Sequence, residues 1–147
     1  MTIEVTIPRA PAEREAALAE LRGGLSELSS DSRAEVWVHH DPFPSLCALI
    51  NGSRGWLMCI RRDGDAGFSS RNPGYSGPSD AEVEYTLSNG QVDRYPASWA
   101  YPTADVLRAL EFFAETGRVP ETLSWWNDSG DGMVSPNAPA DRQGPCR

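Results

Sequence analysis

Alternation of apolar and polar side chains predicts short β-strands along most of this chain. Residues 2–7 alternate strictly, which is typical of a strand with one buried face. The segments 46–50 and 56–60 are instead apolar at almost every position, as in strands that are buried on both faces. Further short strands are predicted at residues 36–38, 82–87, 91–95 and 123–126.

The two apolar segments are expected to form a hairpin in the centre of a sheet. The turn between them, residues 51–55, is rich in Gly and fits a hairpin loop of about three to five residues. A three-residue loop at 52–54 would set Cys47 opposite Cys59. A second hairpin is indicated by Asn89-Gly90, the strongest short-range hairpin signal.

Two helices are predicted from apolar residues three or four positions apart. The first covers residues 12–22, is rich in Ala, Glu and Leu, and is expected to end at Gly23. The second begins after Pro102 and ends at Gly117. Its apolar stripe consists of Val106, Leu107, Leu110 and Phe113, whereas the polar side of the first helix is acidic, with Glu13, Glu15 and Glu20.

The predicted element order is β-α-β-β-β-β-β-α-β. Strands joined by short hairpins favour an α+β fold, here a mainly antiparallel sheet of about six to seven strands with two helices. Residues 61–80 are dense in Gly, Ser, Asp and Pro, and a loop of this length is usually functional or mobile. We expect residues 1–127 to form one domain and residues 128–147, which have few large apolar side chains, to form a disordered tail.

The net charge and the hydropathy of the chain limit the kinds of partner that it is expected to bind. The chain has 13 basic and 21 acidic residues, a net charge of −8. Direct nucleic-acid binding needs a basic surface, so we do not expect it, whereas an acidic surface speeds the approach of a cationic partner. No apolar run approaches the roughly 20 residues of a membrane span, and no secretion signal is recognisable. We therefore expect a cytoplasmic protein that does not bind membranes.

Residues suited to catalysis or metal binding are sparse. The His-His-Asp segment at 39–41 lacks a third ligand at metal-site spacing, and adjacent strand residues point to opposite faces. Cys47, Cys59 and Cys146 match no zinc or redox motif. No complete catalytic constellation is present. We therefore predict no metal, no cofactor and no enzymatic activity.

Several short motifs follow one another in a fixed order between residues 34 and 127. They are Gly55-Trp56-Leu57, Gly67-Phe68 with Ser70-Arg71-Asn72-Pro73, Asn89-Gly90 with Tyr95-Pro96, Trp99 and Trp125. In this order they resemble the deaminase-linked immunity proteins of bacterial polymorphic toxin systems. The resemblance implies an α+β fold, no catalytic function, and protection of the producing cell by binding a toxin domain that is encoded beside the immunity protein.

The resemblance further implies that the chain neutralises a cognate secreted toxin, a nucleic-acid deaminase, by blocking its substrate site. Such a deaminase needs a positively charged approach to its zinc site, and an acidic binder with exposed aromatic side chains could cover it. Two other classes stay open. One is a small-ligand or regulatory binding domain with the loop at 67–78 as a lid, and the other is a hydrolase with a site around 39–41.

The long loop and the strand after it carry the residues expected to bind the partner. Aromatic and Arg side chains are enriched at interface hot spots, and carboxylates suit a cationic partner. The predicted contact residues are Asp63, Asp65, Phe68, Arg71, Tyr75, Glu82 and Glu84. Alternatively, Phe68 and Arg71 fix the loop to the sheet, and the acidic side of the first helix becomes the next candidate surface.

Overall fold

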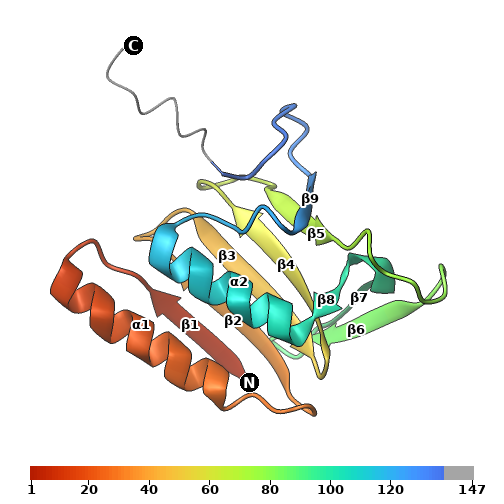
Figure 1. Ribbon diagram of the computed structural model, residues 1–147, viewed down its shortest axis with the longest axis horizontal. Helices are drawn as coiled ribbons and strands as arrows, with labels where there is room; N and C mark the ends of the chain where they lie inside the picture. Colours follow the sequence, from red (N-terminus) through yellow and green to blue (C-terminus); the bar gives the residue numbers. More distant parts are fainter. Residues whose placement is uncertain (138–147) are drawn as a thin grey trace.

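The computed structural model describes residues 1–137, in which two α-helices, one short 3-10 helix and nine strands form (Figure 1). The elements are β1 (Thr2–Thr6), α1 (Pro11–Ser26), β2 (Arg33–His39), β3 (Ser45–Asn51), β4 (Arg54–Ile60), β5 (Phe68–Arg71), β6 (Glu82–Thr86), β7 (Val92–Pro96), η1 (Ala97–Trp99), β8 (Tyr101–Pro102), α2 (Thr103–Thr116) and β9 (Ser124–Asn127). The predicted α+β class is confirmed. The short strands β5 and β8 were not predicted.

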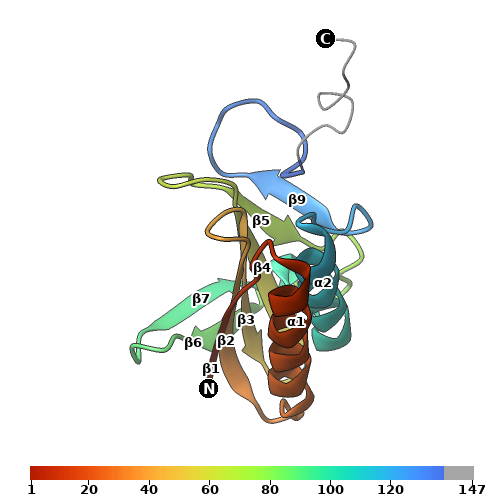
Figure 2. The same cartoon turned by 90° about the vertical axis from the view of Figure 1, so that its left-hand side faces the viewer.

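The main sheet has the strand order β1-β2-β3-β4-β5-β9, and β8 pairs with the start of β4. Its first pair, β1 and β2, is parallel and is connected through α1, whereas the other pairs are antiparallel. The hairpin of β3 and β4 lies in the centre, as predicted. Strands β6 and β7 form a separate two-stranded sheet, which projects from the main sheet on the side away from the helices (Figure 2).

Both helices cover one face of the main sheet (Figure 1). Alternate residues of the strands point toward them, and these side chains form the larger of two buried clusters. The cluster includes Val36, Val38, Leu46, Ile50, Leu57, Leu21, Leu110 and Phe113. Close contact between α2 and β4 requires Gly55, because a Cβ at this position would lie 2.8 Å from Cγ2 of Val106.

Helix α1 does not end at Gly23 as predicted but continues to Ser26. Two glycines each cost a helix roughly 1 kcal/mol relative to Ala. The additional turn buries Leu25 in the core, which offsets part of that cost. Gly24 also allows close contact with β1, since a Cβ there would lie 3.3 Å from Cδ1 of Ile3.

The predicted register of the central hairpin is wrong by one residue. Asn51 pairs with Arg54, which leaves a two-residue loop in which Gly52 has a φ of 61°. Cys47 therefore lies opposite Met58 and not opposite Cys59. Because neighbouring positions on a strand point to opposite sides, the two thiols lie on opposite faces of the sheet.

Residues 128–137 form the first part of the tail that was expected to be disordered. They return to the domain, where the side-chain amide of Asn137 pairs with the backbone of Val119 at N–O distances of 2.8 and 2.9 Å. Asp131 accepts a hydrogen bond from Arg61. These polar contacts hold a segment that has little apolar surface of its own. The remainder of the expected tail, residues 138–147, lies outside the described residues.

Candidate partner-binding face

The face of the main sheet that the helices do not cover carries a row of side chains from six strands. Directly paired residues of neighbouring strands point to the same side, so the strand register defines this row. We call it the cross-strand row: Glu4, Trp37, Cys47, Met58, Ser69 and Trp126. Its two ends are exposed, and the Trp126 residue is 58% accessible to solvent.

The β6–β7 hairpin covers one end of this face and leaves the other open. Tyr85 is buried beneath it, and Tyr95 stacks on Trp56 with 4.5 Å between the ring centroids. Burial raises the pKa of the Tyr95 hydroxyl to about 12, so this group stays neutral and donates a hydrogen bond to Asp93. The hairpin therefore borders the open part of this face.

Arg71 and two Trp rings extend the aromatic stack toward β9. The guanidinium carbon of Arg71 lies 3.6 Å from the ring centroid of Trp99 and 5.8 Å from that of Trp126. Burial lowers the pKa of Arg71, an effect that the nearby Asp128 opposes. Arg71 donates hydrogen bonds to Ser69 and to the backbone of Ser70, but makes no ion pair within residues 1–137.

A hollow of about 520 Å³ opens beyond the cross-strand row, between the loop after β2 and the turn after β4. We call it the acidic hollow. It is lined by Thr6, Trp37, His39, Asp41, Pro42, Phe43, Ser45, Ile60, Asp63 and Gly64.

Hydrogen bonds fix the wall of the acidic hollow. The two ring nitrogens of His39 lie 2.7 Å from Oγ of Ser45 and 2.8 Å from a carboxylate oxygen of Glu4. The Trp37 ring stacks on His39 at an interplanar angle of 11°, and its indole N–H donates to Glu35. Burial acts to raise the pKa of Glu35, but hydrogen bonds from Ser88 and Trp37 outweigh it and leave this pKa lowered.

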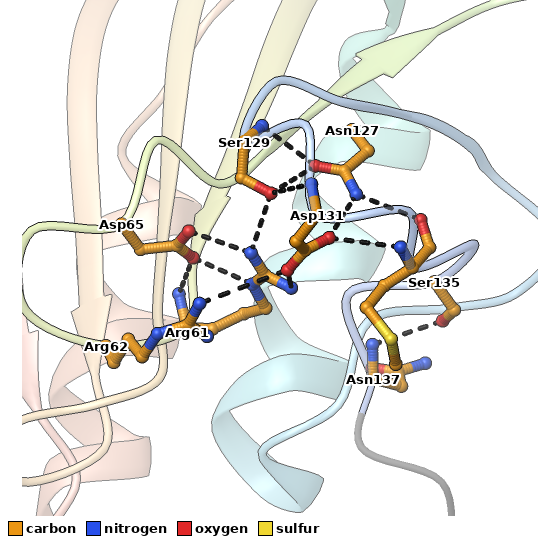
Figure 3. Close-up of polar contacts among 9 residues, drawn as sticks. Arg61, Arg62, Asp65, Asn127, Ser129, Asp131, Ser135 and Asn137 are labelled. Atoms are coloured by element: carbon orange, nitrogen blue, oxygen red, sulfur yellow. Dashed lines mark hydrogen bonds and ion pairs between the residues drawn. The ribbon is translucent and has the colours of Figure 1, made fainter.

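The turn that carries Asp63 is held in place by a cluster of charged side chains around Arg61 (Figure 3). Arg61 donates two hydrogen bonds of 2.8 Å to Asp65 and one of 2.8 Å to Asp131. Only 1% of the Asp65 side chain is accessible to solvent. Hydrogen bonds from Arg61 hold the pKa of Asp65 well below its usual range, so both partners stay charged.

The structure buries two of the predicted contact residues. Phe68 is fully buried on the helix-covered face, because it pairs with Cys59 of β4. Asp65 is enclosed by its bonds to Arg61. The alternative interpretation, that the loop is fixed to the sheet, therefore accounts for Phe68. It also accounts for part of the role of Arg71, whose guanidinium packs on Trp99.

The other predicted contact residues lie in two regions: the uncovered face of the main sheet, and the β6–β7 hairpin with the connection that precedes it. Asp63 lines the acidic hollow, and Arg71 lies on the same face of the sheet as the cross-strand row. Tyr75 lies on the connection to the hairpin, where its hydroxyl donates to the backbone of Pro78. Glu82 is exposed, whereas Glu84 is paired with Arg94 at 2.7 Å.

Four residues of this face were not predicted from the sequence as surface candidates: Trp37, Phe43, Trp126 and Asp41. For Trp37 the signal was its alternation with Val36 and Val38, which points the ring away from the core. For Trp126 it was the adjacent Trp125, since neighbouring strand residues cannot both point inward. Nothing local to Asp41 or Phe43 indicated that they would meet the turn after β4.

The described residues hold no arrangement suited to a metal or a membrane span. No group of three or more His, Cys, Asp or Glu in residues 1–137 could hold a metal ion. His40 instead packs its ring against Phe113 and bonds to the backbone oxygen of that residue. None of the helices described for this part of the chain is long and apolar enough to cross a bilayer.

Comparison with known protein families matches residues 4–127 to the family Immunity protein Imm1. The chain belongs to the Imm1 family. The match extends from β1 to β9 and includes both the helix-covered and the uncovered face of the sheet. The predicted resemblance to immunity proteins of toxin systems is thus confirmed. Membership in the Imm1 family indicates a non-enzymatic role in which the partner is a cognate toxin protein. A search of curated proteins finds no significant match.

Proposed function

We propose that this chain acts in the cytoplasm of the producing cell and neutralises a nucleic-acid deaminase toxin by covering the entrance to its substrate site. The observation that carries the proposal is a face, uncovered by helices, that combines accessible aromatic side chains with carboxylates around a hollow. Trp37 and Trp126 lie in it, and Asp41 and Asp63 stand at its rim.

The chemistry of this face is complementary to that of the proposed target. An enzyme that deaminates bases in a nucleic acid binds a polyanion, so the approach to its zinc site is expected to be basic. A chain with a net charge of −8 competes with the polyanion for that approach. Aromatic side chains then supply the contact area that electrostatic attraction alone does not.

A stable complex requires a contact surface of standard size. A standard interface buries roughly 800 Å² on each partner. This area is about a tenth of the 8066 Å² of accessible surface of the chain. The proposal therefore requires the uncovered side of the sheet, the hairpin and the turn after β4 to contribute to the contact together.

The test uses the C-terminal toxin domain of the secreted protein encoded beside this chain. The purified domain is assayed for deamination of single-stranded DNA and RNA while the immunity protein is titrated in. We expect activity to fall to background near one equivalent. Excess nucleic acid should also weaken the binding of the immunity protein, because the two compete for one site.

Two outcomes contradict different parts of the proposal. A toxin domain that binds the chain but deaminates neither substrate would contradict the assignment of the toxin class. A deaminase that is inhibited with an affinity independent of nucleic-acid concentration would contradict the blocking of the substrate site.

A further inference from the structure

We infer that the acidic hollow receives a Lys or Arg side chain of the toxin domain, with the cross-strand row completing the contact. This inference rests on the proposed function and adds to it the surface and the chemistry of the central contact. It places the partner on the uncovered face of the sheet, away from the acidic side of α1.

The aromatic part of the acidic hollow is arranged before any partner binds. The Trp37 ring is fixed between its stacking contact with His39 and its hydrogen bond to Glu35. Phe43 lies in the lining of the same hollow. A cation near an indole face is attracted by the ring quadrupole, and a preset ring loses little conformational entropy on binding.

The carboxylates of the hollow are available to a partner. Asp41 follows β2 and Asp63 follows β4, so the two come from different strands and line one cavity. Both are exposed, and neither forms an ion pair with any residue of 1–137. Two Arg residues directly precede Asp63 in the chain, and both already have acidic partners: Arg61 is engaged by Asp65 and Asp131, and Arg62 lies 3.9 Å from Asp131.

The absence of Arg from its lining distinguishes this hollow from three others on the described surface. The hollow beside α2 contains Arg108 together with Asp105, Glu111 and Glu115. Those next to the C-terminal loop contain Arg62. The acidic hollow has two carboxylates and no Arg in its lining. A basic side chain is therefore attracted here without a competing positive charge of the protein itself.

The accessible members of the cross-strand row, which exclude the buried Cys47 and Ser69, extend the contact from the hollow toward β9. They run from Trp37 through Met58 to Trp126, which has the larger exposed fraction of the two Trp rings. Arg71 packs its guanidinium 5.8 Å from the ring centroid of Trp126. Trp and Arg are the residue types most enriched at interface hot spots.

The test compares two pairs of substitutions that change the net charge equally. The double variant Asp41→Asn with Asp63→Asn removes the carboxylates of the hollow. The control, Glu15→Gln with Glu20→Gln, removes two exposed carboxylates of α1 that make no ion pair within residues 1–137. Binding to the neighbouring toxin domain is measured by calorimetry, and melting temperatures confirm that each variant is folded.

We expect the hollow variant to weaken binding by about 10- to 100-fold and to reduce its dependence on salt. The α1 variant should change the dissociation constant by less than about 2-fold, because only long-range attraction is lost. A second pair tests the row. Trp126→Ala should weaken binding at least about 10-fold, whereas Phe112→Ala, which removes a ring 41% exposed on α2, should not.

The outcomes separate this inference from the proposed function. If the wild-type chain does not bind the toxin domain, the proposed function fails and the inference fails with it. If the wild type binds and both double variants weaken binding equally, net charge alone is responsible and the hollow is not the site. If only the α1 and Phe112 variants weaken binding, the toxin docks on the helix side.

Discussion

Arg61 joins segments that are far apart in the sequence. It bonds to Asp65 within its own turn and to Asp131, seventy positions further along the chain. The same guanidinium lies 5.0 Å from the ring centroid of Phe68. One side chain thus fixes the turn after β4, the start of β5 and the C-terminal loop. This arrangement explains why the turn carrying Asp63 keeps its shape without regular secondary structure.

The first prediction concerns the pH dependence of stability. Because the folded-state pKa of Asp65 lies below its unfolded value of about 4, its contribution is complete above about pH 5 and is lost as the pH falls. Asp65→Asn should lower the free energy of unfolding by roughly 3 kcal/mol at pH 7, since it leaves the largely buried Arg61 side chain without its main partner.

Urea unfolding followed by Trp fluorescence between about pH 3 and 7 tests this prediction. The difference in the free energy of unfolding between wild type and Asp65→Asn should decrease as the pH falls toward about 3. Asp131→Asn serves as the matched control, and its loss should be smaller because Asp65 still neutralises Arg61. A difference that is constant with pH would show that Asp65 does not titrate as its contacts require.

The connection between β4 and β5 depends more on Gly67 than on Gly64. Gly64 and Gly67 have φ values of 75° and 76°, a conformation that costs other residues roughly 1–2 kcal/mol. A Cβ on Gly67 would lie 2.2 Å from the backbone oxygen of Cys59, whereas a Cβ on Gly64 would meet nothing within 4 Å. Only Gly67 therefore combines backbone strain with a steric clash.

We expect Gly64→Ala to lower the free energy of unfolding by roughly 1–2 kcal/mol. Gly67→Ala should lower the free energy of unfolding by that amount and by a further roughly 1–3 kcal/mol, because β5 must shift away from β4. Chemical denaturation of the two variants provides the measurement. Equal losses would show that the β4–β5 pair tolerates the displacement.

At the scale of the whole molecule, the main sheet separates two buried clusters of unequal size. The cluster under the helices contains Cys59, and the smaller one, under the β6–β7 hairpin, contains Cys47. Burial raises the pKa of the Cys59 thiol to about 12 and raises that of Cys47 as well. The rate at which each thiol reacts with a reagent therefore measures how often the layer that covers it opens.

We predict that both thiols react slowly with a thiol reagent in the native state and that Cys47 reacts faster than Cys59. A two-stranded hairpin is only marginally stable without its packing contacts, so its layer should open more often than the helix layer. A Cys146→Ser background removes the third thiol, which lies outside the described residues. Mass spectrometry after timed labelling gives the two rates. Rapid labelling of both would contradict their burial, and equal slow rates would show that the layers open together.

Local patterns predicted most of this fold. Alternation in β2 and the continuous apolar runs of β3 and β4 indicated the central strands. The features that were missed depend on distant contacts: β5 is four residues long and is stabilised by pairing with β9. That pairing also fixes which way Phe68 points, and so its place in the core. The end of α1 depended on Leu25, whose burial no helix-breaking signal at Gly23 could reveal.

The candidate face was predictable only in part. Asp63 and Arg71 were identified because their residue types suit an interface, and the structure places both on the uncovered side. Asp41 and Asp63 are 22 positions apart in the sequence, so no motif could indicate that they share a cavity. Their proximity follows from the fold: β2 and β4 flank β3 and run in the same direction, so their C-terminal ends lie at the same end of the sheet.

The strict alternation within β2 also bears on how such chains diversify. Val36 and Val38 maintain the fold from one side of the strand, whereas Trp37 and His39 present the other side to the surroundings. A substitution at the outward positions leaves the helix contacts intact. Cys47 and Ser69 are buried, but the other members of the cross-strand row are accessible, and each sits on its own strand. Under the proposed binding mode, a lineage facing changed toxins would acquire a new specificity one accessible position at a time, through successive folded intermediates.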